Sequence, residues 1–524
     1  MTSSTGSTAP PQRVGIIGAG ISGLAYADVL QRLGYRVALF ERAERVGGVW
    51  ARAYPDVNLQ NTGNEYRLSS FPWPFPPEQH PTGTEILRYL DALVAARGFD
   101  VRLLHEVVQA RRAEGGGWTL QVRSAGTGTS ASASSETTER VDHLVVSIGQ
   151  YTEGKHRPEL PGEAEFCGRV VTERDVKNLS VFDDKRVVVV GFGKSALDMA
   201  TLASGRAAQV HQVFRTARWT LPRTVFGVHL TWLLFNRFGS VMMPSWTHPT
   251  AAERLLHRLA PLVRGFWAGL QSLVRHLARR EGRGFGEEGE ARLRAVLPDH
   301  PLVPDLRSAA ALAPIGYYRL VGSGKVLPRR AEVTGLSAGG VRLSTGEELA
   351  ADLVVLAVGS RSPTFPFLEE RDRALLESES DGVQLYRHLV HPRIPDLAFA
   401  GYNHGFMHVP AAEIGALWLA ALWRGELALP PVEEMERAVE HVQAWKRANI
   451  HFEPSRSCAV NTRFQQYLDV LLKDLGVSSY RKLPNVIAEV FDRYGAADYA
   501  GVVEEYLARR PSRTKPRRPL PLPT

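Results

Sequence analysis

Residues 14–27, VGIIGAGISGLAYA, decide the fold of this chain. A short apolar run leads into a turn that places Gly18, Gly20 and Gly23 in the spacing GxGxxG, and an apolar helical pattern follows. The first glycine allows a tight turn, the second lets the backbone approach a pyrophosphate, and the third lets helix and strand pack closely. The next strand, RVALFE, ends at Glu41, where a carboxylate can accept hydrogen bonds from a ribose. This unit predicts a dinucleotide-binding domain.

The chain builds a second turn of the same kind at residues 187–200, VVVVGFGKSALDMA. Gly191 and Gly193 occupy the first two glycine positions, and Ala196 stands at the third, which the pattern tolerates. The strand QVHQVF follows and ends at Arg215, 19 residues after Ala196. An arginine here binds a 2′-phosphate through paired charge-assisted hydrogen bonds, whereas a carboxylate would repel that phosphate. We therefore expect the second domain to bind NADPH.

The stretch after the first unit indicates which dinucleotide the first domain binds. ERAERVGGVW, residues 41–50, places Gly47, Gly48 and Trp50 directly after the strand. This loop resembles the flavoprotein pattern in which FAD lies extended along the sheet. Further stretches carry the same resemblance, and these are NLQNTGNEYRLSSFPWP (58–74), SIGQY (147–151), RTARWTLPR (215–223), DLVVLAVGSRSPTFPFLEE (352–370) and the segment 397–436. Most of the chain resembles the flavin-containing monooxygenases, class B flavoprotein monooxygenases related to the Baeyer–Villiger monooxygenases.

The resemblance implies an α/β fold with two dinucleotide-binding (Rossmann-like) domains, in which an NADPH domain is inserted into an FAD domain and a helical C-terminal extension follows. The expected order is a disordered leader at 1–12, the first part of the FAD domain at 13–178, the NADPH domain at 183–360 with a helical insertion at about 225–300, the second part of the FAD domain at 361–430, a helical extension at 431–508 and a disordered basic tail at 509–524. The low-complexity segment 125–139 is expected to be a flexible hairpin loop.

The resemblance also implies a reaction. In this family NADPH reduces FAD, and the reduced flavin combines with O2 as a C4a-(hydro)peroxyflavin that gives one oxygen atom to a small organic substrate. We expect oxygenation of a nitrogen or sulfur atom. Baeyer–Villiger or ring oxygenation in a secondary-metabolite pathway is one alternative, and an NADPH oxidase-like flavoprotein is another.

The family's active-site asparagine falls on Asn61, which we expect to protect the oxygenated flavin. The alternative is that Asn61 only caps the turn beside Thr62 and Gly63. The expected cofactor-binding residues are Gly18, Gly20, Ser22, Gly23, Glu41, Gly48, Trp50 and Gly149 on the FAD side, and Gly191, Gly193, Lys194, Ser195 and Arg215 on the NADPH side. His404 and His408 receive no role, because lone histidines are more often only packed and hydrogen-bonded.

One position departs from the family pattern. The signature between the two turns reads roughly FxGxxxH, and here FCGRVVT, residues 166–172, has Thr172 where the histidine belongs. The departure bears on the reaction subtype rather than on the fold or the cofactors.

The composition bears on three further questions, namely metal binding, nucleic-acid binding and membrane insertion. The 524 residues include two cysteines, Cys167 and Cys458, which form no CxxC pair or metal-ligand cluster, so we expect a reduced, cytoplasmic setting and no metal. The tail from 509 holds six basic residues and no acidic one, so most of the net charge of +8 is local and does not indicate a nucleic-acid partner. No apolar run reaches the ~18 residues that cross a bilayer. The expected partners are a small molecule and O2, with a monomer or a homodimer both open.

Overall fold

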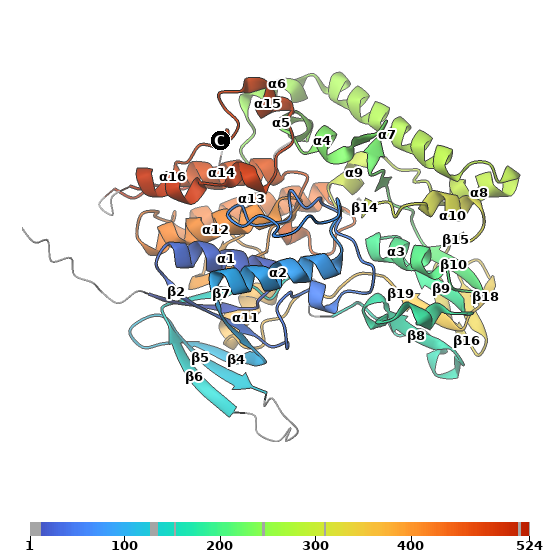
Figure 1. The fold of residues 1–524 in the computed structure, drawn as a ribbon, viewed down its shortest axis with the longest axis horizontal. Helices are drawn as coiled ribbons and strands as arrows, with labels where there is room; N and C mark the ends of the chain where they lie inside the picture. Colours follow the sequence, from blue (N-terminus) through green and yellow to red (C-terminus); the bar gives the residue numbers. More distant parts are fainter. Residues whose placement is uncertain are drawn as a thin grey trace, which may run out of the picture.

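The structure is a computed structural model that describes residues 12–125, 135–150, 154–243, 247–308, 311–511 and 515–522. Two mainly parallel sheets form its framework, with helices α1 (Ile21–Arg32) and α2 (Gly83–Arg97) beside the first and α3 (Lys194–Ala203) beside the second (Figure 1). The predicted leader up to residue 11 and the centre of the low-complexity segment, 126–134, lie outside the described residues.

The first sheet is built around the first glycine turn. Its strand order is β20-β21-β7-β1-β2-β3, and every pairing is parallel except that of the edge strand β20 with β21. The strands are β1 (Arg13–Ile17), β2 (Arg36–Glu41), β3 (Asp100–Leu103), β7 (His143–Val146), β20 (Val390–His391) and β21 (Ile394–Phe399). The central strands are almost wholly buried, as their continuous apolar runs require in a parallel sheet that is covered on both faces.

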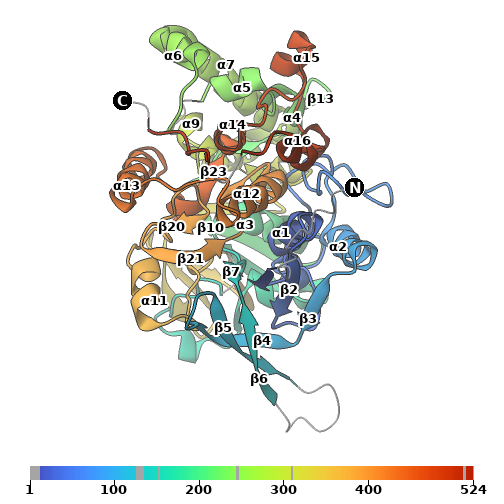
Figure 2. The ribbon, with the colours of Figure 1, turned by 90° about the vertical axis from the view of Figure 1, so that its left-hand side faces the viewer.

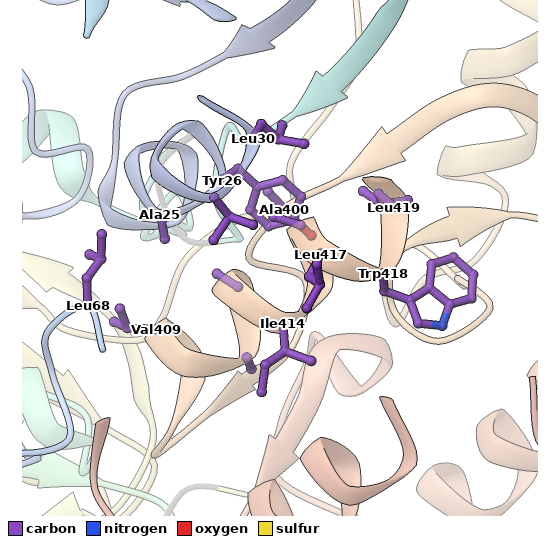
Figure 3. Close-up of a cluster of buried hydrophobic side chains, with 14 of the residues drawn as sticks. Ala25, Tyr26, Leu30, Leu68, Ala400, Val409, Ile414, Leu417, Trp418 and Leu419 are labelled. Atoms are coloured by element: carbon purple, nitrogen blue, oxygen red, sulfur yellow. The ribbon is translucent and has the colours of Figure 1, made fainter. Parts of the chain in front are cut away.

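Helix α1 starts at the glycine turn and is held in place by α12 (His408–Trp423), against which it packs (Figure 3). The α12 sequence is apolar on all sides, and 13 of its 16 residues are buried. The Tyr26 hydroxyl on α1 donates to the Phe399 carbonyl at 3.1 Å, which ties the helix to β21. Leu30 and Leu417 have no exposed surface. Since burying a leucine is worth about 1.5–3 kcal/mol, this packing holds α1 against α12.

The second sheet is built around the second glycine turn, with the parallel order β15-β10-β9-β19-β8. Its strands are β8 (Arg169–Thr172), β9 (Arg186–Val190), β10 (Gln209–Phe214), β15 (Leu327–Arg330) and β19 (Leu353–Leu356). An antiparallel meander between β15 and β19 consists of β16 (Val333–Ser337), β17 (Gly340–Leu343) and β18 (Glu348–Ala350).

The chain passes between the two sheets twice, and the two crossing segments are paired with each other. Lys155 and Ser360 form an antiparallel bridge. On either side of it, the His156 amide donates to the Gly359 carbonyl and the Arg361 amide donates to the Gly154 carbonyl, both at 2.9 Å. The structure therefore corrects the predicted start of the second domain. The strand β8 lies at 169–172, within the predicted first domain, because its partner is β19, far along the chain.

A helical segment is inserted between β10 and β15, and it forms the upper right of Figure 1. Its helices are α4 (Leu230–Leu234), α5 (Arg237–Val241), α6 (Ala251–Arg258), α7 (Ala260–Gly282), α8 (Gly286–Val296), α9 (Leu302–Leu306) and α10 (Tyr317–Gly322). Two short strand pairs accompany them, β11 (Thr220–Leu221) with β14 (Ala311–Leu312) and β12 (Thr224–Val225) with β13 (Val228–His229).

The chain then returns to the first sheet and adds further helices, of which α14 packs against α12. These helices are α11 (Glu370–Glu377), α13 (Val432–Asn449), α14 (Phe464–Leu475), α15 (Val486–Phe491) and α16 (Val502–Arg509). A three-stranded arm of β4 (His105–Arg112), β5 (Trp118–Ser124) and β6 (Ser135–Val141) projects from the opposite end of the molecule (Figure 2). The short strands β22 (His404–Gly405) and β23 (Ala459–Asn461) join the loop before α12 to the segment before α14.

The prediction of a disordered tail is wrong for residues 515–522. Arg517 pairs with Leu427 in a parallel bridge, in which the Arg517 amide donates to the Glu426 carbonyl at 3.0 Å. The Leu520 amide donates to the Asp474 carboxylate at 2.8 Å. A tail without an apolar face can still bind through its backbone, and composition does not reveal such partners.

Candidate active site

One large cavity, about 1790 Å³ in volume, connects the two glycine turns. The predicted site residues that line it are Gly18, Gly20, Ser22, Glu41, Gly48, Trp50, Asn61, Gly149, Gly191, Gly193, Lys194, Ser195 and Arg215. Of the predicted set, Gly23 alone is not part of this wall. Ligand pockets usually measure about 300–1,000 Å³, so this cavity has room for more than one ligand.

The geometry of the first turn explains its glycines. Gly18 has φ +105°, and a Cβ there would lie 2.4 Å from the Ser147 carbonyl oxygen. A Cβ on Gly23 would lie 2.3 Å from the Gly18 carbonyl oxygen, so Gly23 serves the close packing of α1 on the turn. That role places Gly23 behind the turn and outside the cavity wall.

The passage in front of α1 fits a pyrophosphate. A Cβ on Gly20 would meet only the Gly48 Cα, at 3.8 Å, so two glycine backbones face each other across the passage. Gly20 is the N-cap of α1, no side chain caps the helix, and its first turn holds no acidic residue. The amide groups at this helix start are thus available to an anion.

Glu41 lies where the prediction requires, at the end of β2 against the cavity. Its carboxylate is buried and accepts hydrogen bonds from the backbone amides of Ala19 and Ala43, each at 2.9 Å. A carboxylate has about four acceptor positions, so two remain for a ribose diol. The backbone bonds fix its orientation.

The second turn repeats this arrangement. Gly191 has φ +129°, and a Cβ there would lie 2.4 Å from the Ala357 carbonyl oxygen. A Cβ on Gly193, the N-cap of α3, would meet no atom within 4 Å, and no side chain caps the helix. The open space over this helix start fits a second pyrophosphate.

Lys194 and Arg215 differ in how free their charges are. Lys194 forms an ion pair with Asp198 one turn along α3, and Asp198 also accepts a hydrogen bond of 2.6 Å from Tyr54. Arg215 stands at the end of β10 with 78% of its side chain exposed, and its one ion pair among the described residues, with Glu332, is long at 3.8 Å. Arg215 is therefore the better placed of the two for a 2′-phosphate.

Asn61 is buried and reaches across the cavity wall to the loop before α12, where its side-chain amide donates to the Phe406 carbonyl. The turn beside Asn61 is instead satisfied by Glu65, whose carboxylate accepts from the Thr62 amide at 2.8 Å. The Asn61 side chain therefore makes a long-range contact, and the turn beside it is capped by Glu65 instead.

Aromatic side chains lie close to Asn61 on the cavity side. Tyr66 accepts a hydrogen bond of 2.6 Å from the Trp50 indole, and its ring lies 5.0 Å from that of His408. Burial lowers the pKa of His408 to about 4 and also lowers the pKa of His404, so both imidazoles are neutral at physiological pH.

The structure adds residues that the sequence did not indicate. His229 and residues from α4 line the cavity, and so do Phe452 and Asn461 from the C-terminal region. The apolar run 225–235 suggests a buried helix or a channel wall, whereas the positions of Phe452 and Asn461 lie outside every motif and appear only in the tertiary structure. Thr172 occupies the position of the family histidine and does not line the cavity wall; its hydroxyl donates to Asp175 at 2.7 Å.

A buried carboxyl group holds the segment after Asn61 onto α12. Glu413 accepts hydrogen bonds from the Ser69 amide at 2.9 Å and from the Ser69 hydroxyl at 2.8 Å. Burial raises the pKa of Glu413 to about 7, with these bonds opposing the shift. Glu413 lies outside the cavity wall, so its role is structural.

Within the ranges that the structure describes, no helix combines the length and apolar character needed to cross a membrane. Nor do three or more histidine, cysteine, aspartate or glutamate side chains gather there into a site that could hold a metal ion.

Comparison with known proteins identifies similar chains. A family model for pyridine nucleotide-disulphide oxidoreductases matches residues 15–244, and a flavin-binding monooxygenase-like model matches residues 318–490. A probable flavin-containing monooxygenase 1 of Arabidopsis thaliana is 28% identical, with 93% of this chain and 96% of the relative covered. Dimethylaniline monooxygenase [N-oxide-forming] 2 of Rattus norvegicus is 27% identical, with 89% of this chain and 83% of the relative covered. The solved structure of S-allyl-L-cysteine S-oxygenase from Allium sativum superposes with a TM-score of 0.61 at 19% identity, covering 97% of this chain and 96% of that one.

Proposed function

The chain belongs to the flavin-containing monooxygenases and is an oxidoreductase that uses FAD and NADPH, and from this premise we propose that it oxygenates a nitrogen or sulfur atom of a small organic molecule. Two similar proteins support this choice of atom by their names, an N-oxide-forming dimethylaniline monooxygenase and an S-allyl-L-cysteine S-oxygenase.

The observation that carries the proposal is the single cavity shared by both glycine turns. A hydride donor and its flavin acceptor must lie in contact, and two dinucleotides that enter one cavity from opposite sheets can meet in it. When bound, FAD supplies the oxygen-activating chemistry and NADPH supplies the electrons. The start of α1, Gly20, Gly48 and Glu41 would hold FAD, and the start of α3 with Arg215 would hold NADPH.

The wall around Asn61 favours an uncharged nucleophile. Leu230, Leu234 and Phe235 line the cavity here, and the Phe235 ring lies 4.5 Å from that of Phe406. Apolar walls penalise a protonated amine because burying an unpaired charge is costly, so they favour a neutral amine or a thioether. Such atoms keep a lone pair, which is what accepts an electrophilic oxygen.

Within this wall we assign Asn61 a positioning and shielding role. Its amide joins the 58–68 stretch to the loop that carries Phe406, and so closes the wall at the point where both segments meet. A closed wall keeps water from the reacting atoms.

The test supplies purified holoenzyme with NADPH, ¹⁸O2 and a panel of a tertiary aromatic amine, an aryl thioether and a cyclic ketone. We expect one ¹⁸O atom in an N-oxide or a sulfoxide and no turnover of the ketone. Conversion of the ketone to an ester in preference to the other two would instead favour Baeyer–Villiger oxygenation. Stoichiometric hydrogen peroxide without any product would favour an oxidase.

A further inference from the structure

Two histidines from distant parts of the chain meet beside the Asn61 stretch. His80 and His229 lie 149 positions apart, and their Nε2 atoms are 2.9 Å apart. His80 lies between the Asn61 stretch and α2, whereas His229 ends β13 and caps α4 in the inserted segment. Both side chains are buried, and His229 lines the cavity.

The partners of the two rings fix their protonation. The His80 Nδ1 lies 3.2 Å from the Leu59 carbonyl and 3.1 Å from the Asn61 carbonyl, and since carbonyls only accept, this nitrogen carries the hydrogen. The His80 Nε2 is then a bare acceptor, so the His229 Nε2 must donate to it. The His229 Nδ1 is left as an acceptor, and the Thr231 amide donates to it at 3.3 Å. The Thr231 hydroxyl lies 2.9 Å from the same atom.

These bonds form one directional chain from Thr231 through His229 and His80 to the Asn61 carbonyl. The chain requires both rings to be neutral, because a proton on the His80 Nε2 would face the His229 N–H. Burial and the nearby Arg223 lower the pKa of His80 to about 4, and burial with Arg493 and Arg223 lowers the pKa of His229. The electrostatic surroundings therefore agree with the hydrogen-bond pattern.

The same two segments converge a second time, on Phe406. Asn61 donates to its carbonyl, and Phe235, directly after α4, packs on its ring. The histidine pair thus sets the register of α4 against the Asn61 stretch at the part of the wall that the proposed reaction needs closed.

We propose that His80 and His229 are positioning residues that lock the inserted segment onto the Asn61 stretch and so keep the substrate end of the cavity closed during oxygen transfer. This inference rests on the proposed function for its effect on catalysis, but the lock itself does not depend on which substrate is used.

The test compares His80→Leu, His229→Leu and their double variant in the FAD-loaded enzyme. His229→Gln keeps a donor at the position of Nε2 and serves as the rescue. His211→Leu is the matched control, because His211 is also buried, with its pKa lowered to about 4, but lies on β10 outside the cavity wall.

The first readout is product formed per NADPH oxidised, with the rate of flavin reduction and the FAD content measured alongside. We expect each Leu variant to lower the product yield per NADPH about fivefold, the factor that one neutral hydrogen bond contributes, with hydrogen peroxide rising to match. The double variant should lose no more than either single variant, and His229→Gln should recover most of the yield. Unchanged yields, or losses that multiply in the double variant, would overturn the proposal.

The second readout needs no substrate, so it separates this inference from the proposed function. Hydrogen–deuterium exchange of the holoenzyme should rise at both 58–68 and 228–235 in each Leu variant and at neither segment in His211→Leu. Faster exchange at only one segment, or at neither, would show that the histidines do not couple the two segments, whatever atom the enzyme oxygenates.

Discussion

At the scale of single residues, the charge at each strand end distinguishes the two dinucleotides. Arg215 is mostly exposed at the cavity and has only a long ion pair, so its guanidinium is available to a 2′-phosphate. We expect the wild type to prefer NADPH strongly over NADH. Arg215→Ala should weaken the apparent affinity for NADPH about 10- to 150-fold and leave the affinity for NADH nearly unchanged, as measured by KM for each nucleotide.

Arg206→Ala is the control for this prediction, because Arg206 is exposed in the same domain and pairs with Asp183 outside the cavity. It should leave both KM values unchanged. Equal use of the two nucleotides by the wild type would refute the assignment of Arg215.

Asn61 offers the second prediction at this scale. It lies outside both glycine turns, so Asn61→Ala should bind FAD and be reduced by NADPH at the wild-type rate. Losing its bond to the Phe406 carbonyl opens the wall, so NADPH oxidation should continue with hydrogen peroxide as the main product. Stopped-flow spectroscopy measures the rate of flavin reduction, and a peroxide assay measures the hydrogen peroxide that is released. Asn64→Ala is the control, because Asn64 lies in the same stretch but outside the cavity wall. If Asn61→Ala forms as much product per NADPH as the wild type, Asn61 does not shield the reaction.

Glu413 predicts a pH dependence of stability. Its pKa in the folded state, about 7, lies above the ordinary value of 4.5, so the fold favours the protonated carboxyl. This contribution is fully present below about pH 4.5 and is lost as the pH rises through about 7, to an extent on the order of 3 kcal/mol. Glu413→Gln should therefore be more stable than the wild type at pH 8 and similar to it at pH 5.

Denaturant unfolding at both pH values measures this effect. Glu433→Gln, at the exposed start of α13, controls for the removal of a negative charge. If the wild type and Glu413→Gln lose stability in parallel between pH 5 and pH 8, another group is responsible.

At the scale of elements, the tail pairs with the 426–428 segment through one isolated parallel bridge. Deleting residues 512–524 removes the backbone bonds that Arg517 makes to Glu426 and Ala428, and the bond from Leu520 to Asp474. We expect a loss on the order of 2 kcal/mol, seen as a Tm lower by about 2–4 °C with unchanged flavin content. Arg518→Ala keeps these backbone bonds and should melt like the wild type. A truncated chain with wild-type Tm would show that these tail contacts contribute nothing to stability.

The elements also show where sequence reasoning succeeds. Both glycine turns were predictable because their conformation is local: Gly18 and Gly191 sit at positive φ where a Cβ would strike a backbone carbonyl. The strand β8 was placed in the wrong domain because its partner β19 lies far along the chain. The His80–His229 pair was not predicted because the two residues lie 149 positions apart and neither local sequence indicates that they meet. Sequence patterns thus reveal constraints within one unit, whereas pairing between units appears only after folding.

At the scale of the whole molecule, the cavity between the two glycine turns would be filled in part by FAD. We expect the flavin to be bound without a covalent bond, and we expect its removal to destabilise the protein, because a cavity of about 1790 Å³ would be left empty. Acid or heat should release FAD rather than FMN. Restoring FAD to 100 times its Kd should stabilise the apoprotein by about 2.7 kcal/mol, visible as a rise in Tm. FMN in the supernatant, or a Tm insensitive to FAD, would contradict this.

The paired crossing segments at Lys155 and Ser360 have a consequence for how such a protein can change over time. Because the nucleotide module leaves and re-enters the flavin half at adjacent points, it has the geometry of a cassette whose two ends meet. A genetic exchange with breakpoints at these two positions would replace the whole reductant-binding half together with the inserted segment, and it would join the chains within one short two-stranded hinge. A graft made at these positions would therefore carry the His229 and Phe235 side of the cavity with it, so its success depends on keeping the partners His80 and Phe406 in the half that is retained.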